Sequence, residues 1–140
     1  MFAGFVALSF AAAFAGAAIY VNWVEQPARL KLDDQALLSE WGPSDSRGVA
    51  LLAAFALVSA VAGFVAWFET QDVRFVFGAL VIICAWPYAF FVMAPLNNQI
   101  LSLRGKDVAA ARALVRQWGL VESGFAAIGA VAVAIFLWAS

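Results

Sequence analysis

The fold of this chain is decided by residues 49–68, VALLAAFALVSAVAGFVAWF, a stretch that contains no charged residue. Arg47 lies just before the stretch, and Glu69 lies just after it. A membrane hydrocarbon core about 30 Å thick is crossed by roughly 20 apolar residues in a helix. Residues 49–68 therefore predict a transmembrane helix with a charged residue near each membrane boundary.

Three other stretches have the same apolar character: residues 2–23, 75–94 and 118–138. We expect the last of these helices to begin earlier, near Asp107. An Asp can cap the free amides at that point, and the Ala-rich run that follows favours helix. The sequence therefore predicts one membrane domain over residues 1–140, with an all-α fold: an antiparallel four-helix bundle that spans the membrane four times.

The composition also indicates a membrane protein. Of the 140 residues, 66% are hydrophobic and 12% are charged, whereas soluble domains carry about 25% charged residues. The net charge of −1 provides no basic field, so we expect no nucleic-acid partner. The single cysteine excludes an intrachain disulfide, and the absence of histidine excludes His-ligated haem, zinc and copper sites and Ser-His-Asp triads. We expect neither a metal nor a cofactor.

The connections between the spans differ in length and in charge. Residues 25–48 and 95–117 form long connections, whereas residues 70–74 form a short one. Seven of the eight Lys and Arg residues lie in the long connections, and only Arg74 lies in the short one. Because Lys and Arg are enriched on the cytoplasmic side of membranes, we expect both long connections in the cytoplasm and both termini outside.

The first long connection contains a helical pattern of its own. In residues 33–41, DDQALLSEW, Leu37, Leu38 and Trp41 fall on one helical face, and Asp33 or Asp34 can act as the N-cap. This pattern predicts a short amphipathic helix that lies on the cytoplasmic membrane surface between the first two spans. Residues 42–46, GPSDS, are expected to end that helix.

Small residues are frequent in the first span. They form two rows at a spacing of four residues, Ser9–Ala13–Ala17 and Ala12–Gly16. Because rows of small residues let membrane helices pack closely, these rows predict the face through which the first span contacts its neighbours.

Polar residues of the spans are expected to collect at the cytoplasmic end of the bundle. The three groups come from the end of the first span, the end of the third and the start of the fourth. They are Tyr20, Asn22 and Glu25; Tyr88, Asn97 and Asn98; and Gln117, Trp118 and Glu122. The outward half of the bundle contains almost only Ala, Val, Leu, Ile and Phe. We therefore predict a shared polar site at the cytoplasmic end.

Glu122 is the most informative of these residues. Counted back from Trp138, it lies about one turn inside the hydrocarbon, where a carboxyl group is costly and usually marks a functional site. Trp118 lies four residues earlier, on the same helical face. An aromatic wall beside a buried carboxyl would suit a flat apolar molecule with one ionisable proton. The alternative is a structural carboxyl, either protonated or paired with Arg29 or Arg116.

The same reasoning predicts where the Glu122 carboxyl points. We expect it to face the interior of the bundle, within hydrogen-bonding reach of Tyr20, Asn22 or Glu25. Glu25 itself is expected to pair with a basic neighbour at the interface. The third span carries a second signal, AWPY at residues 85–88. Pro87 lacks the N–H that a helix needs, so we predict a kink over residues 83–88 that borders a cavity beside Trp86.

Three short motifs carry a family resemblance: IYVNWVEQPARL at residues 19–30, MAPLNN at 93–98 and RQWGLVE at 116–122. They resemble a bacterial family of small four-span membrane proteins of unknown function, which is grouped with the fungal anthrone oxygenases. Those enzymes oxidise a tricyclic phenolic anthrone to an anthraquinone with molecular oxygen. The resemblance implies a location in the bacterial cell membrane. It also implies a site at Tyr20, Asn22, Glu25, Pro27, Asn97, Asn98, Trp118 and Glu122.

The chain departs from that family pattern in the fourth span. The family often has a His at the position of Glu122 and an Arg at the position of Phe125. If the family His acts as a base, Glu122 could replace it, because a carboxylate can also accept a proton. Without the Arg, the chain lacks a possible partner for an anionic intermediate at that position.

Three classes of function remain open from the sequence. The first is a cofactor-independent oxygenase or proton-transfer enzyme that acts on a hydrophobic, aromatic or quinone-like molecule. In this hypothesis Glu122 is the base, Tyr20 and Asn98 donate hydrogen bonds to the oxyanion, and six residues bind the substrate. These six are Asn22, Glu25, Trp86, Tyr88, Asn97 and Trp118.

The second class is a non-catalytic protein, either a lipid-binding bundle or an accessory subunit of a larger membrane complex or homo-oligomer. Its polar cluster would bind a lipid headgroup or a partner loop. The third class, a transporter or channel, has the least support, because the outward half of the bundle provides no polar path.

Overall fold

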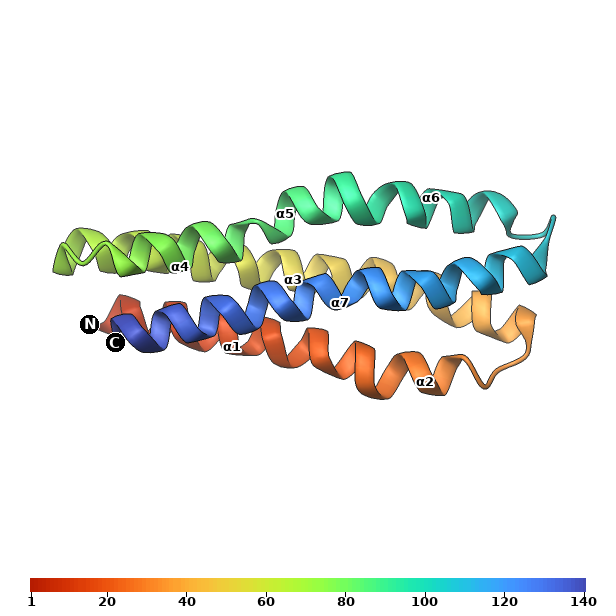
Figure 1. Cartoon of the computed structure of the whole chain (residues 1–140), viewed down its shortest axis with the longest axis horizontal. Helices are drawn as coiled ribbons and strands as arrows, with labels where there is room; N and C mark the ends of the chain where they lie inside the picture. Colours follow the sequence, from red (N-terminus) through yellow and green to blue (C-terminus); the bar gives the residue numbers. More distant parts are fainter.

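The computed structural model describes residues 1–140, and every regular element in it is a helix. The helical segments are α1 (Phe2–Tyr20), η1 (Val21–Glu25), α2 (Gln26–Arg29), α3 (Asp34–Thr70), α4 (Arg74–Ile83), α5 (Ala85–Tyr88), η2 (Ala89–Met93), α6 (Ala94–Leu103) and α7 (Val108–Ala139). The segments η1 and η2 are π-helical. Joined end to end, the segments form four antiparallel rods (Figure 1). The predicted all-α four-helix bundle is confirmed.

The four rods are long and apolar enough to cross a membrane, and the protein is a multi-pass membrane protein. Both termini lie at one end of the bundle, together with the short connection after α3 (Figure 1). The opposite end is formed by residues 25–48 and 95–117, which hold seven of the eight Lys and Arg residues, and we call it the basic end. With 37 residues, α3 is about 55 Å long. The bundle is therefore longer than the roughly 30 Å hydrocarbon core.

The separate surface helix expected over residues 33–41 is wrong. Helix α3 runs without interruption from Asp34 to Thr70, with Pro43 in its interior. Leu37, Leu38 and Trp41 are buried within the protein. The reason is that α7 runs alongside this part of α3 and covers this face, where Trp41 packs edge to face on Trp118 at 6.0 Å between ring centroids. An apolar stripe that meets another helix does not need the membrane surface.

The two predicted helix starts are present. Asp33 accepts a hydrogen bond from the backbone N–H of Ala36 at 2.9 Å, so it caps α3. Asp107 accepts one from the backbone N–H of Ala110 at 3.1 Å, so it caps α7. Each cap satisfies an amide that would otherwise lack a partner. These caps fix the positions at which the second and fourth rods begin.

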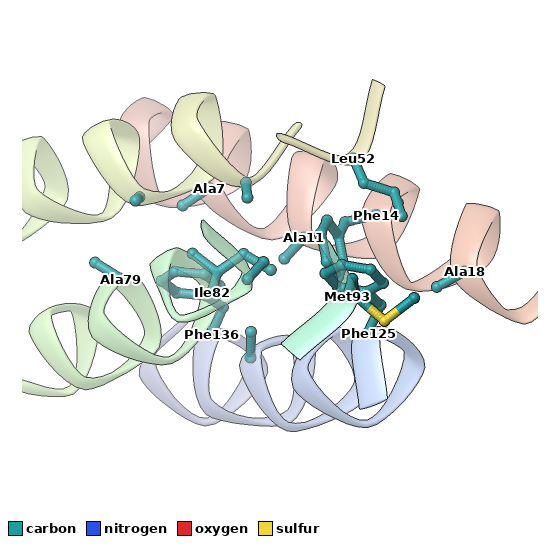
Figure 2. Packing of buried hydrophobic residues seen from close by; sticks show 14 of the residues in the cluster. Ala7, Ala11, Phe14, Ala18, Leu52, Ala79, Ile82, Met93, Phe125 and Phe136 are labelled. Atoms are coloured by element: carbon teal, nitrogen blue, oxygen red, sulfur yellow. The ribbon is translucent and has the colours of Figure 1, made fainter. Parts of the chain in front are cut away.

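The packing face of α1 differs from the predicted rows. Residues on those rows, Ser9, Ala12, Ala13 and Gly16, are exposed. The buried row is Ala3, Ala7, Ala11, Phe14 and Ala18, and the last four of these are labelled in Figure 2. In a helix so rich in Ala, several rows have small residues at a spacing of four. The row that turns inward is the one whose Phe14 ring can pack edge to face on Phe125, at 6.1 Å.

Glycines allow close approach where the rods meet. A Cβ atom on Gly129 of α7 would lie 2.8 Å from the Cα atom of Ala15 in α1. A Cβ atom on Gly63 of α3 would lie 3.1 Å from the Phe136 ring, which is fully buried beside Ile82 (Figure 2). At Gly129 the bundle is therefore held at a separation that only glycine permits, and at Gly63 an added Cβ would fit only if the Phe136 ring shifted.

The third rod is irregular where Pro87 predicted a kink. Helix α4 ends at Ile83, α5 begins at Ala85, and the π-helical η2 follows (Figure 1). An apolar hollow of about 170 Å³ lies beside Trp86, between the third rod and α3. Both the departure from a straight helix and the bordering cavity are confirmed.

The short connection at the terminal end is closed by a local ion pair. Arg74 lies 2.5 Å from Asp72, and its guanidinium stacks on the Trp138 ring at 5.2 Å from the ring centroid. Hydrogen bonds from the Arg74 side chain and backbone lower the pKa of Asp72. These contacts join the start of α4 to the end of α7.

Candidate functional site

A cavity of about 350 Å³ lies near the basic end, between the first rod, α3 and α7. Its walls combine apolar and aromatic side chains with several charged groups. The lining residues are Ala17, Tyr20, Val21, Glu25, Ser44, Asp45, Arg47, Gly48, Val49, Leu51, Leu52, Trp118, Glu122 and Phe125. Three of the four rods therefore contribute to one cavity, although the first rod and α7 lie far apart in the sequence.

Glu122 lies in this cavity with its side chain turned to the protein interior. The residue is only 3% exposed, and its carboxyl accepts a hydrogen bond from the Asn22 side chain. Asn22 also donates to the backbone carbonyl of Ala18 at 3.3 Å. The prediction that Glu122 faces inward and meets a polar residue from the end of the first span is confirmed. Neither Arg29 nor Arg116 forms an ion pair with Glu122.

The π-helical segment η1 brings the polar end of the first rod against α7. A π-helix contains an extra residue per turn, and such turns are frequent at functional sites. Directly after η1, the buried Gln26 donates to the backbone carbonyl of Val115 at 2.9 Å. A Cβ atom on Gly119 would lie 2.6 Å from the Gln26 amide nitrogen. Gly119 therefore makes the space through which the first rod reaches α7.

A buried arginine network lies beside the cavity. The side chain of Arg29 is 1% exposed and pairs with Glu25 at 2.5 Å and with Glu40 at 2.7 Å. It also donates to Gln26 at 3.2 Å and to Ser44 at 3.0 Å. Its guanidinium carbon lies 5.2 Å from the centroid of the Trp118 ring. The expected pairing of Glu25 with a basic neighbour is confirmed, and the network joins the first rod, α3 and α7.

A second polar contact reaches the cavity from α6. The Asn97 side chain donates to the Asp45 carboxyl at 2.8 Å, and Asp45 lines the cavity. Sequence reasoning missed Ser44, Asp45 and Arg47, because GPSDS was interpreted as a break between helices. A helical count through Pro43 would have placed Ser44 and Gly48 on the same face as the apolar residues that follow.

Only some of the residues predicted for the site come together at the cavity. Tyr20, Glu25, Trp118 and Glu122 line it, and Tyr20 is 55% exposed at its rim. Asn22 contributes through its hydrogen bond to Glu122. The first and fourth rods therefore supply most of the predicted residues that reach the cavity.

The predicted residues of the third rod lie outside this cavity. Tyr88 packs on the Phe125 ring at 5.2 Å and donates to the backbone carbonyl of Val121 at 2.5 Å. Trp86 donates to the carbonyl of Ala53 at 3.1 Å, beside the smaller apolar hollow. Asn98 is exposed on α6 and does not line the cavity. Tyr88 therefore contacts a cavity wall, the Phe125 ring, from behind, whereas Asn98 is not among the lining residues.

The comparison with protein families identifies the group to which these features belong. The family model described as anthrone oxygenase matches residues 41–135. The chain belongs to the anthrone oxygenase family. No curated protein and no solved structure matches the chain.

The matched part of the anthrone oxygenase family contains most of the cavity. It includes Asp45, Arg47, Trp118 and Glu122, but it begins after the polar end of the first rod. The structure contains no group of three or more Cys, Asp or Glu residues that could hold a metal ion. The side chains that line the cavity offer carboxyls, one guanidinium, a hydroxyl, a phenol and aromatic rings.

Proposed function

We propose that this protein is a membrane enzyme of the anthrone oxygenase type, in which Glu122 takes a proton from a flat phenolic molecule bound in the cavity. The observation that carries this proposal is the Glu122 carboxyl, which is 3% exposed and lines a cavity with aromatic walls. Ionisable groups within membrane spans are costly and are usually retained for function. A single hydrogen bond from Asn22 holds this carboxyl in place.

The size and lining of the cavity support an aromatic ligand. Pockets that bind small molecules commonly measure about 300 to 1,000 Å³ and are mostly apolar with a few polar groups. This cavity, at about 350 Å³, is near the lower limit. Tyr20, Trp118 and Phe125 provide ring surfaces, and Leu51 and Leu52 provide aliphatic ones. A flat molecule of about three fused rings fits such walls.

The proposed reaction converts a CH₂ group flanked by two aromatic rings into a ketone. Glu122 removes one proton from the CH₂ carbon, and the electron pair left behind is delocalised onto the oxygen of the opposite ring carbonyl. The anion reacts with O₂ to form a C–O bond and a peroxide. Glu122 returns its proton to the outer peroxide oxygen, and the O–O bond breaks as the second hydrogen is lost. The overall balance is CH₂ + O₂ → C=O + H₂O.

The proposed setting is a bacterial cell membrane with the basic end in the cytoplasm. The bias of seven basic residues to one supports this orientation. The substrate would be a hydrophobic small molecule that partitions into the membrane, because the cavity lies beside the apolar spans. Membrane lipids would surround the remaining exposed apolar surface, where Phe90, Phe91 and Leu120 are each more than 70% exposed.

Turnover of an anthrone by the purified protein tests this proposal. We expect the wild-type protein to accelerate O₂ consumption and anthraquinone formation above the spontaneous rate measured without protein. Glu122→Gln keeps the shape of the side chain but cannot accept the proton, so it should lower kcat at least about 100-fold. Glu69→Gln, which changes an exposed carboxyl at the other end of the bundle, is the matched control and should keep full activity.

The outcome also distinguishes the alternative function. If the wild-type protein binds the ligand without any turnover, the protein is a lipid-binding or accessory component. In that case Glu122→Leu should be tolerated or stabilising, because replacing a buried ionisable group with an apolar one of similar size often stabilises a protein.

A further inference from the structure

The charges around the cavity are unequal in number and in pairing. Three carboxyls line it, those of Glu25, Asp45 and Glu122, but only one cation, Arg47. Glu25 is paired with the buried Arg29, and Arg29 itself does not line the cavity. Arg47 is thus the one positive group that a molecule in the cavity would meet.

Arg47 is also free of protein partners. The arginine side chains that form ion pairs in the structure are those of Arg29, Arg74 and Arg112. Arg47 cannot turn to Asp45, because residues two apart on a helix point to different sides. Asp45 is instead held by Asn97 at 2.8 Å. Arg47 therefore lines the cavity with no hydrogen bond or ion pair to the rest of the chain, and its N–H donors are available to a ligand.

Proton transfer to Glu122 leaves an anion on the ligand, which requires a cation or a hydrogen-bond donor beside it. When a carboxylate takes a proton from a neutral carbon acid, the negative charge moves from Glu122 to the ligand. In a delocalised aromatic anion that charge resides mainly on oxygen, away from the carbon that lost the proton. Beside apolar walls an unpaired anion is costly, whereas a fixed donor or cation at the oxygen lowers that cost.

We propose that Arg47 binds the anionic oxygen of the ligand and is a further catalytic residue of this cavity. The inference rests on the proposed function, since it assigns a partner to the anion that Glu122 would generate. That oxygen is the one opposite to the acidic C–H group in the ligand class of the proposed function. Glu122 and Arg47 act on the two sides of the ligand.

Binding of an inert coloured ligand tests the role of Arg47 without turnover. We choose 2-hydroxyanthraquinone, because its phenol ionises with a visible colour change. The measurement is the pH midpoint of the colour change for the ligand bound to protein in a neutral maltoside detergent. A cation at the oxygen favours the ionised form, so loss of Arg47 raises the midpoint. We expect Arg47→Ala to raise it by about one pH unit, which is about a tenfold weaker preference for the anion.

Two further variants make the result specific. Arg116→Ala removes the same charge from the basic end, but Arg116 is exposed, forms no ion pair and does not line the cavity. This control should leave the midpoint unchanged. Arg47→Lys keeps the charge without the planar fork and should raise the midpoint by less than Arg47→Ala does. Because Arg47 is exposed, its variants should keep the thermal stability of the wild type, which is measured in parallel.

The guanidinium could also bind the phosphate of a lipid headgroup, and the same assay separates the two sources of anionic oxygen. If Arg47→Ala and wild type share one midpoint in the maltoside detergent and differ only in phosphatidylglycerol nanodiscs, Arg47 binds lipid phosphate and the inference is wrong. Equal midpoints in both media, or no binding of the ligand to wild type, would also overturn it.

Failure of the inference is distinguishable from failure of the proposed function. The colour change depends on Arg47, and turnover depends on Glu122. If Glu122→Gln keeps full turnover while Arg47→Ala still raises the midpoint, the proposed role of Glu122 is wrong and the anion site is retained. If Glu122→Gln loses turnover while Arg47→Ala has no effect on the midpoint, only the assignment of Arg47 fails.

Discussion

Gly129 sets how closely α1 and α7 approach each other. Gly129→Ala would place a Cβ atom 2.8 Å from the Ala15 Cα atom, and a backbone atom cannot move aside as a side chain can. We expect the substitution to lower the free energy of unfolding by about 1–3 kcal/mol. Gly16→Ala is the matched control on α1, since an added Cβ meets nothing within 4 Å there. Thermal unfolding in detergent measures both, and equal melting temperatures would contradict the prediction.

Arg29 is expected to stabilise the fold, because its buried guanidinium pairs with two carboxyls. Arg29→Met removes the cation from between Glu25 and Glu40 and leaves two carboxyls without their partner. We expect a loss of about 1.5–3 kcal/mol in the free energy of unfolding, because the carboxyls left unpaired are themselves 26% and 36% exposed and stay partly hydrated. Combining it with Glu25→Gln and Glu40→Gln should restore part of that loss. Arg116→Met, at an exposed and unpaired arginine, should change stability by less than about 0.5 kcal/mol. The measurement is the same thermal unfolding.

At the residue scale, the sequence was sufficient to predict the orientation of a side chain where solvation alone decides that orientation. Glu122 had to turn inward because a carboxyl that faces acyl chains has no hydrogen-bond partner. Arg47 and Asp45 could not be assigned to the cavity, because their positions depend on whether the helix continues through Pro43. Asn98 was grouped with Asn97 by adjacency, but neighbouring residues on a helix point about 100° apart. Only Asn97 faces α3, through its hydrogen bond to Asp45.

At the scale of helices, both π-helical turns precede a proline. Segment η1 ends two residues before Pro27, and η2 ends two residues before Pro95. A proline has no N–H and collides with the carbonyl four residues earlier. A wider turn before the proline relieves this collision. Pro43 in α3 has no π-helical turn before it.

This difference predicts the effect of removing Pro43. Pro43→Ala supplies a missing N–H in the middle of a continuous helix and removes the collision with the Ser39 carbonyl. We expect it to increase the free energy of unfolding, by up to about 3 kcal/mol. Thermal unfolding reports the change, and circular dichroism should report unchanged helix content. A loss of stability would indicate that the chain bends at Pro43, as the sequence alone had suggested.

The helix boundaries show which features a local sequence pattern can predict and which it cannot. The caps at Asp33 and Asp107 were predictable because capping depends on residues within one turn. The kink at Pro87 was predictable for the same local reason. The continuity of α3 was not, because Leu37, Leu38 and Trp41 form an apolar face that either a membrane surface or α7 could cover. Tertiary packing decided between the two.

For the whole molecule, we predict that the basic end faces the cytoplasm. Single cysteines in a Cys84→Ser background test this with an impermeant thiol reagent on intact cells. Ser140→Cys, at the terminal end, should be labelled from outside. Ser46→Cys, exposed at the basic end, should be labelled only after the membrane is opened. The reverse pattern would show that the positive-inside bias does not set the orientation here.

The number and order of the membrane helices followed from composition and length, because a bilayer accepts only helices whose backbone groups are satisfied internally. Which faces of the helices pack together did not follow from composition and length. The rows of small residues on α1 gave several equivalent faces, and only the Phe14 ring selects the inward one. The cavity lies between three rods, so its lining depends on their relative rotation, which no single span encodes.

The hydrogen bond between Asn22 and Glu122 joins residues that are 100 positions apart, on the first and last rods. A chain is made from its N-terminus, so these two groups reach the bilayer at different times. Asn22, a neutral amide, enters first. Glu122 enters last, when Asn22 is already in place to receive it. The Glu122 carboxyl is the more costly of the two groups to leave unpaired in lipid, and its hydrogen-bond partner is therefore already in the membrane when it enters. A circularly permuted chain that begins at α7 would reverse this order, and would expose the carboxyl during biogenesis even though its finished contacts were the same.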